Sequence, residues 1–396
     1  MEKILSKIPI KIKNGDVEIL DFNVRVLKML TLWPENDKSI SSWSFIKYYI
    51  LILSLCPSSV PVFIDMIMQL QTKDGLINAT DNITGLAPWF GMMYMTGCFM
   101  RNRQQMKYLV RVLRNDFNKF GSRDFVKETS QKASFYSKFF LLYCISGNFT
   151  YASIPLIEKE YCLHEMELMN KTQYSVSCGV IIRTGLPGIN LNYSPRREMV
   201  MMTQMWAIIM ITVPVLSITM FLCSLLMHLV SEILNLQEML INVCENGISK
   251  DEMLRFIFRY SDKMRDAFSS MLLVHLTLTS FTISILGYEV VFVKTFAGSL
   301  RFALHLGGWL LILMLTCYFG QQLIDESSKI ALMAYSTAWF NGTPRLRKDI
   351  WFIIMRSQRP LQLTAASMGS MSLETFLRVM SSAYSYFTLL LNVHFK

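Results

Sequence analysis

Charged side chains are scarce in this sequence. Asp, Glu, Lys and Arg make up 17% of its 396 residues, whereas hydrophobic residues make up 52%. A soluble chain usually carries about 25% charged residues. So few polar side chains cannot cover the surface of a water-soluble globule of this size. The composition therefore excludes a disordered or fibrous chain and predicts a protein embedded in a membrane.

The motifs of common enzyme and metal sites are also missing. The sequence has no phosphate-binding glycine loop, no His-Glu-x-x-His, no Cys-x-x-Cys and no Gly-x-Ser-x-Gly. We therefore expect no catalytic residue, no metal ion, no cofactor and no enzyme activity. The net charge of +10 could indicate nucleic-acid binding, but in so apolar a chain it favours basic cytoplasmic loops, and we expect no nucleic-acid partner. The histidines lack the spacing of metal ligands and are scattered at His164, His228, His275, His305 and His394.

Seven stretches contain no charged residue and are long enough to cross a bilayer, whose hydrocarbon core of about 30 Å needs about 20 helical residues. Because mid-span carboxylates are also missing, a proton-coupled transporter is disfavoured. The fourth stretch is too long for the bilayer alone, so we expect its helix to continue into water. Two shorter windows, 330–344 and 360–373, are interpreted as helices that do not span. The seven stretches are 48–64, 82–100, 139–157, 199–231, 267–288, 302–324 and 379–395.

The positions of Lys and Arg predict the orientation of these spans. If the N-terminus is cytoplasmic, the inner segments hold 28 of the 39 Lys and Arg residues and the outer segments hold 9. Cytoplasmic loops are the ones enriched in basic residues. We therefore predict an all-α membrane protein with seven transmembrane helices, a cytoplasmic N-terminus and an extracellular C-terminus.

Two further features suit the predicted outer loops. Cys162 and Cys178 share one such loop, where a disulfide could form. Sequons for N-glycosylation fall on the predicted outside at Asn78, Asn82, Asn170 and Asn192, although two others lie in a span and on the inside.

Aromatic and methionine side chains cluster in the outer thirds of the predicted spans, beside a few polar groups. Belts of interfacial Trp and Tyr explain part of this pattern, but they do not explain why the inner side has little counterpart. An apolar cavity with few polar groups suits a sparingly soluble organic molecule. We therefore predict a ligand pocket in the outer half, with candidate residues Trp89, Tyr94, Phe149, Tyr151, Met205, Trp206, Phe302, His305 and Trp309.

The inner segments carry amphipathic helical patterns over 252–270, 323–340 and 350–363. Apolar stripes in water must pack against something, so we expect a cytoplasmic helical layer below the membrane. This divides the chain into four parts: a cytoplasmic N-terminal segment at 1–43, six spans with the pocket at 44–324, a cytoplasmic anchor segment at 325–374 and a seventh helix at 375–396.

The last 80 or so residues carry specific motifs. They include Gly320-Gln321-Gln322-Leu323, Leu373-Glu374-Thr375-Phe376 and Ser385-Tyr386-Phe387-Thr388-Leu389-Leu390, and Leu32-Trp33-Pro34 precedes the first span. With seven spans and this topology, the chain resembles the insect odorant receptor family. The loop after the fourth span lacks the long insertion of the shared co-receptor, so the chain resembles a ligand-tuning member.

The resemblance implies an odorant-gated, non-selective cation channel in the plasma membrane of a sensory neuron dendrite. Such a chain assembles with the co-receptor as a hetero-tetramer around one pore. The seventh helix would line that pore, with the hydrophobic gate near Leu389 and pore-facing residues at Asn392 and Val393. The alternatives are a seven-helix G-protein-coupled chemoreceptor, which the charge bias disfavours, and the related gustatory receptors, which share the topology.

Overall fold

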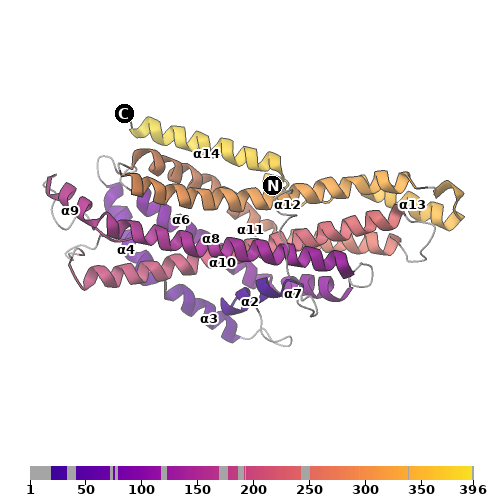
Figure 1. The fold of residues 1–396 in the computed structure, drawn as a ribbon, viewed down its shortest axis with the longest axis horizontal. Coiled ribbons are helices and arrows are strands. Elements are labelled where there is room, and N and C mark those ends of the chain that lie inside the picture. Colours follow the sequence, from indigo (N-terminus) through magenta and orange to yellow (C-terminus); the bar gives the residue numbers. More distant parts are fainter. Residues whose placement is uncertain are drawn as a thin grey trace.

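A computed structural model describes residues 19–33, 42–71, 75, 79–116, 123–168, 177–185, 191, 193–241, 250–293, 295–337 and 339–394. Over these residues the chain forms one elongated, all-helical bundle, and its one strand-like feature is an isolated bridge between Thr364 and Ser370 (Figure 1). The helices are α2 (Asp21–Met29), α3 (Ser42–Leu53), α4 (Cys56–Leu70), α6 (Thr80–Arg101), α7 (Arg103–Arg111), η1 (Val112–Asp116), α8 (Arg123–Ile157), α9 (Lys159–Leu168), α10 (Arg196–Ile241), α11 (Lys250–Phe292), α12 (Phe296–Tyr335), η3 (Trp339–Asn341), α13 (Pro344–Ser357), η4 (Ala366–Met368) and α14 (Leu373–His394).

All seven predicted spans fall on helices. Among the described residues, α8, α10, α11 and α12 are long and apolar enough to cross a membrane. The first predicted span is divided between α3 and α4, which are bent by 47° and could form a fifth crossing as a pair. Helices α6 and α14 cover the second and seventh predicted spans but do not reach the same hydropathy. The protein is therefore a multi-pass membrane protein, and the number seven stays a prediction.

The long helices extend well beyond a bilayer. Helix α10 has 46 residues, which corresponds to about 69 Å at 1.5 Å per residue, about twice the hydrocarbon thickness. Helix α11 joins the predicted inner segment 252–270 to the fifth span without a break, and α12 likewise runs straight through the predicted domain boundary at 324/325. The predicted anchor segment is thus partly a continuation of the spanning helices rather than a separate unit.

The prediction of a helix over 360–373 is wrong. This stretch is a folded strap in which the N–H of Met371 donates to the carbonyl of Leu363 and the N–H of Ala365 donates to the carbonyl of Gly369. Gly369 has a φ of +107°, which side chains disfavour, and Pro360 cannot continue a helix. The window 330–344 is helical only to Tyr335 and in η3, before α13 begins at Pro344.

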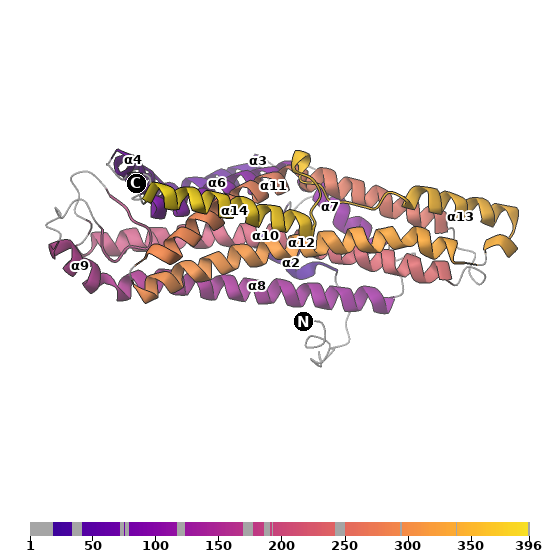
Figure 2. The same cartoon turned by 90° about the horizontal axis from the view of Figure 1, so that it is seen from above.

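The two ends of the bundle differ in what they carry. Helix α9 and the C-terminal end of α14 lie at one end, the α9 end, whereas α13 lies at the other, the α13 end (Figures 1 and 2). Helix α10 runs between them as the central helix: 72% of its most apolar window is buried, against 22% for α8 and 28% for α12. Helices α8 and α12 therefore hold outer positions, whereas α11 is 61% buried over its most apolar window.

The core around α10 is built from close aromatic contacts. Phe221 is fully buried, and its ring lies 5.8 Å from that of Trp33, 6.0 Å from that of Phe99 and 6.4 Å from that of Phe268. These residues come from four separate segments of the chain. Phe221 thereby ties α6, α10, α11 and the segment after α2 into one core.

Helix α14 packs against α11 and α12 along one stripe. Thr375, Val379 and Ala383 are buried and lie four residues apart, on a single face. The remaining faces include exposed Leu377, exposed Leu389 and other exposed side chains, so much of this helix contacts nothing else among the described residues.

Candidate ligand-binding cavity

A cavity of about 160 Å³ lies inside the bundle toward the α9 end. Its walls come from the second half of α8, the first halves of α6, α10 and α12, and α4. The lining is mostly apolar. For comparison, an engineered apolar cavity of about 150 Å³ accepts benzene. The space therefore suits a small organic molecule.

Four of the nine predicted pocket residues line this cavity: Trp89, Tyr151, His305 and Trp309. The other five do not. Tyr94, Phe149 and Trp206 have exposed side chains on the outside of the bundle, with exposed fractions of 44%, 68% and 45%. Trp206 instead donates its indole N–H to Ser54 Oγ at 3.1 Å.

The remaining two predicted residues, Met205 and Phe302, pack close to the cavity without lining it. Met205 packs against a small cluster that includes Val62 and Ile181. Phe302 is buried, and its ring meets the ring of Tyr151 edge-on with 6.3 Å between centroids. Phe302 therefore packs against the wall residue Tyr151, and Met205 packs beside the cavity.

Small residues in the cavity walls create the space. None of them was among the predicted pocket residues. Gly147, Gly308 and Ala207 lie on α8, α12 and α10 and line the cavity. An added Cβ at Gly147 would meet no atom within 4 Å. A glycine inside a helix lowers helix stability by about 1 kcal/mol relative to alanine. A glycine within a predicted span could therefore have indicated a position where a side chain must be absent.

Two polar bridges hold the walls in place. The hydroxyl of Tyr143 donates to the carbonyl of Leu304 at 3.1 Å, which joins α8 to α12. Nδ2 of Asn148 donates to Thr212 Oγ1 at 2.7 Å, which joins α8 to α10. Because these donors already have protein acceptors, the bridges fix the positions of the helices around the cavity.

Residues 177–185, here called the cover segment, close the cavity on the side of the α9 end, and Ile182 is part of its wall. Gln204 of α10 holds this segment with both ends of its amide. Its Oε1 accepts from the N–H groups of Ile181 and Ile182 at 2.9 and 3.2 Å. Its Nε2 donates to the carbonyl of Ile182 at 2.8 Å and to Thr184 Oγ1 at 2.7 Å. Gln204 is fully buried, so water cannot replace these bonds.

A buried charged group fastens the cover segment to α6 and α12. Nη2 of Arg301 donates to the carbonyl of Ile181 at 2.7 Å and to the hydroxyl of Tyr151 at 3.0 Å, and it lies 3.4 Å from Asp81 Oδ1. The other carboxylate oxygen of Asp81 accepts from the N–H of Arg183 at 3.0 Å. The guanidinium also lies over the ring of Tyr151, 4.2 Å from its centroid. Arg301 thus links a wall residue of the cavity to its cover.

Asn82, one of the predicted glycosylation sites, is not available for a glycan. Its side chain is fully buried, and Nδ2 donates to Asp65 Oδ2 at 2.8 Å and to the carbonyl of Val62 at 3.1 Å. A glycan would have to be attached to that nitrogen, so this prediction is wrong for the folded chain. Asn78, Asn170 and Asn192 lie outside the described residues.

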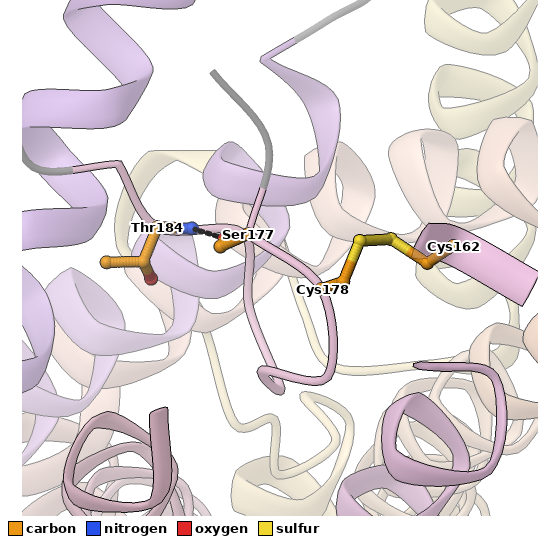
Figure 3. The surroundings of a disulfide bond; sticks show 4 residues. All are labelled: Cys162, Ser177, Cys178 and Thr184. Carbon is orange, nitrogen blue, oxygen red and sulfur yellow. Dashed lines mark hydrogen bonds between the residues drawn. A yellow bond between two sulfur atoms is a disulfide. The ribbon is translucent and has the colours of Figure 1, made fainter. Parts of the chain in front are cut away.

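A disulfide joins Cys162 of α9 to Cys178 of the cover segment, with 5.8 Å between the Cα atoms (Figure 3). The segment folds back on itself, because the N–H of Thr184 donates to Ser177 Oγ at 3.1 Å. Gly179 follows the cysteine with a φ of +78°, a conformation that favours glycine. The cover is therefore fixed covalently as well as by hydrogen bonds.

Comparison with known proteins gives a consistent result. Residues 76–384 match the model of the family described as 7tm Odorant receptor. The chain is 32% identical over 152 residues to odorant receptor 13a of Drosophila melanogaster and 26% identical over 146 residues to the odorant receptor coreceptor of Ooceraea biroi. These alignments cover 35% and 36% of this chain, and the chain spans only 36% and 30% of the length of those relatives.

The whole fold also has solved counterparts. A structure of the insect olfactory receptor OR5 from Machilis hrabei in complex with eugenol superimposes with a TM-score of 0.77 and 16% sequence identity, over 95% of this chain and 99% of that one. The structure of the same receptor that is described without eugenol gives a TM-score of 0.76, over 94% of this chain and 97% of that one. The family match extends over well more than half of the sequence, and the chain belongs to the 7tm odorant receptor family.

Proposed function

We propose that this chain is the ligand-tuning subunit of an odorant-gated, non-selective cation channel. It binds a small apolar or volatile organic molecule in the cavity toward the α9 end. The apolar cavity, with its hydrogen-bonded walls and fixed cover, is the observation that carries this proposal. A similar fold in a receptor described in complex with eugenol supports it.

In the proposed topology the chain crosses the membrane seven times, with the N-terminus cytoplasmic and the C-terminus extracellular. The α9 end then lies outside, which suits a disulfide, because disulfides persist in oxidising compartments. The α13 end lies inside, and α13 itself carries four Lys or Arg residues, as the positive-inside bias requires. Glycans at Asn78, Asn170 and Asn192 would be placed outside.

The pore is proposed to run along α14. Four subunits, including the co-receptor, would arrange their α14 helices around one axis, with Leu389 as the hydrophobic gate and Asn392 and Val393 facing the pore. The exposed side chains of Leu389 and Asn392 on an incompletely covered helix support this. A ring of leucines can stop ions by dewetting. The co-receptors among the relatives of this chain are consistent with such a partner.

The anchor segment at 325–374 is proposed to hold the subunits together below the membrane. Its helices expose large side chains in the isolated chain, among them Leu332, Tyr335 and Trp351. Where exposed apolar side chains gather into a large patch, they mark a protein–protein interaction site. We propose the plasma membrane of the sensory neuron dendrite as the location of the assembled channel.

Current recordings with the co-receptor test this function. A panel of volatile organic molecules should open a cation current in cells that express both chains, and an epitope after Lys396 should be labelled on intact cells. Leu389→Ala should raise the current without ligand, because a smaller side chain lets the pore wet. The matched control Leu377→Ala changes an equally exposed leucine of the same helix and should stay closed. A silent panel together with labelling only after permeabilisation would overturn the proposal.

A further inference from the structure

The indole of Trp309 fixes the protonation of His305. Nε1 of Trp309 donates to Nε2 of His305 at 3.1 Å. Because an indole nitrogen can only donate, Nε2 of the imidazole must be an acceptor and cannot carry a proton. The proton of the neutral ring therefore sits on Nδ1, which makes Nδ1 a donor. This nitrogen is buried and has no hydrogen-bond partner among the described residues.

A second hydrogen-bond donor of the cavity wall, on Trp89, also lacks an acceptor among the described residues. Trp89 lines the cavity from α6, whereas His305 lines it from α12. Nε1 of Trp89 is likewise buried and has no partner in the described part of the chain. The donors of Tyr143 and Asn148, by contrast, are already bonded to protein acceptors. Buried donors without partners are rare in folded proteins, and each has a cost until an acceptor reaches it.

We propose that these two N–H groups select ligands that carry a hydrogen-bond acceptor oxygen on an otherwise apolar frame, as in ketones, esters and ethers. This inference rests on the proposed function, because it takes the cavity as the odorant site. An acceptor oxygen would satisfy a donor that a hydrocarbon leaves unpaired. One such bond to a buried donor should raise affinity by about tenfold.

Matched ligands of nearly equal size test whether the receptor prefers molecules with an acceptor oxygen. Acetophenone, 1-phenylethanol and cumene share a phenyl ring and a three-atom head that carries an acceptor, a donor and acceptor, or neither. The aliphatic set is 2-heptanone, 2-heptanol and 2-methylheptane. The receptor, co-expressed with the co-receptor, should respond to the ketone of at least one set at about tenfold lower concentration than to its hydrocarbon.

Three substitutions and one control variant sharpen the test. Trp89→Phe and His305→Phe each remove a donor and should shrink the gap between ketone and hydrocarbon. Trp309→Phe frees Nε2 of His305, so the proton can move there and Nδ1 can accept. That variant should shift preference from the ketone toward the alcohol, whereas a merely structural loss would weaken all three ligands alike. Trp206→Phe removes an indole outside the cavity and should leave the order unchanged.

Thermal unfolding of the purified protein with each ligand separates this inference from the channel proposal. Stabilisation in the order ketone above hydrocarbon, without any current, would contradict the channel function and support the inference. Equal or reversed order of ketone and hydrocarbon in both sets, by current or by stabilisation, would overturn the inference and leave the channel proposal intact. Absence of any response in both measurements would overturn both.

Discussion

The two halves of the bundle share long helices such as α10 and α12 but are packed differently. Toward the α13 end, the middle of α10 sits in a continuous core in which Phe221, Leu225 and Leu229 are fully buried. Toward the α9 end, the same helix borders an open cavity with Ala207 and Ile208. One half buries this helix on all sides, and the other leaves room for a ligand.

The sizes of the side chains explain this difference. In the packed half, Phe221 fills the centre with contacts to three other aromatic rings. In the open half, Gly147 and Gly308 present no side chain where two helices face the cavity. The open half compensates with polar ties, since Gln204 and Arg301 hold its cover. Different segments of the long helices thus provide the stable core and the proposed ligand site.

The largest effect should come from the packed half. Phe221→Ala should lower the free energy of unfolding by about 3–5 kcal/mol, because it removes a fully buried ring and leaves a void. Ile312→Ala, at the cavity wall, should cost about 2 kcal/mol or less, because fewer neighbouring atoms are lost beside an existing space. Thermal unfolding of both variants in one detergent checks this contrast. Equal losses would show that the two halves are packed alike.

Filling the cavity should have a large effect on ligand response and a small one on stability. Gly147→Leu places a side chain where an added Cβ meets nothing, so we expect sensitivity to fall by about a hundredfold or more, which corresponds to about 2.7 kcal/mol. The melting temperature should stay the same or rise, because leucine favours a helix more than glycine does. Dose–response currents and melting curves measure the two effects.

The matched control for this variant is Leu142→Phe, which adds volume to an exposed position of the same helix. It should leave both the dose–response curve and the melting temperature unchanged. If Gly147→Leu responded like the wild-type chain, the ligand would occupy another part of the molecule.

A smaller effect is expected at the cover. Gln204→Leu keeps the approximate size of the side chain but leaves the N–H groups of Ile181 and Ile182 without their acceptor. Such a loss should cost about 1–3 kcal/mol and should expose the cover segment to faster amide hydrogen exchange than in the wild-type chain. Exchange measured by mass spectrometry over residues 177–185 tests this. Unchanged exchange would mean that the disulfide and the contacts of Arg301 and Asp81 hold the cover without Gln204.

The arrangement of helices could be predicted from the sequence to a large extent, because long charge-free stretches have few alternatives in a membrane. Each of the seven predicted spans lies on a helix, including the bent pair α3 and α4. The strap over 360–372 was not predicted, because an apolar stretch without charges does not reveal a close backbone contact. Gly320 makes that contact possible: a Cβ there would come within 2.4 Å of the carbonyl oxygen of Met371.

The candidate site could be located but its members could not be chosen reliably. Residues of α8 that line the cavity follow helical spacing, as Tyr143, Gly147 and Tyr151 do. Phe149 is two residues from Tyr151 and therefore lies about 200° around the helix, facing outward. The presence of an aromatic residue does not show whether it faces the cavity or the outside of its helix. A criterion based on aromatic residues also cannot select the glycine and alanine residues of the wall. Only the packing of all five helices decides which side chains face inward.

Labelling of the native Cys144 shows most directly whether an activating ligand occupies this cavity. Cys144 lines the cavity, whereas the half-buried Cys98 packs on the core outside it. The rate of modification by methyl methanethiosulfonate should be measured for both thiols by mass spectrometry, with and without a saturating ligand that evokes current. We expect the ligand to slow the modification of Cys144 and to leave the rate at Cys98 unchanged. Equal rates at Cys144 with and without the ligand would contradict this expectation.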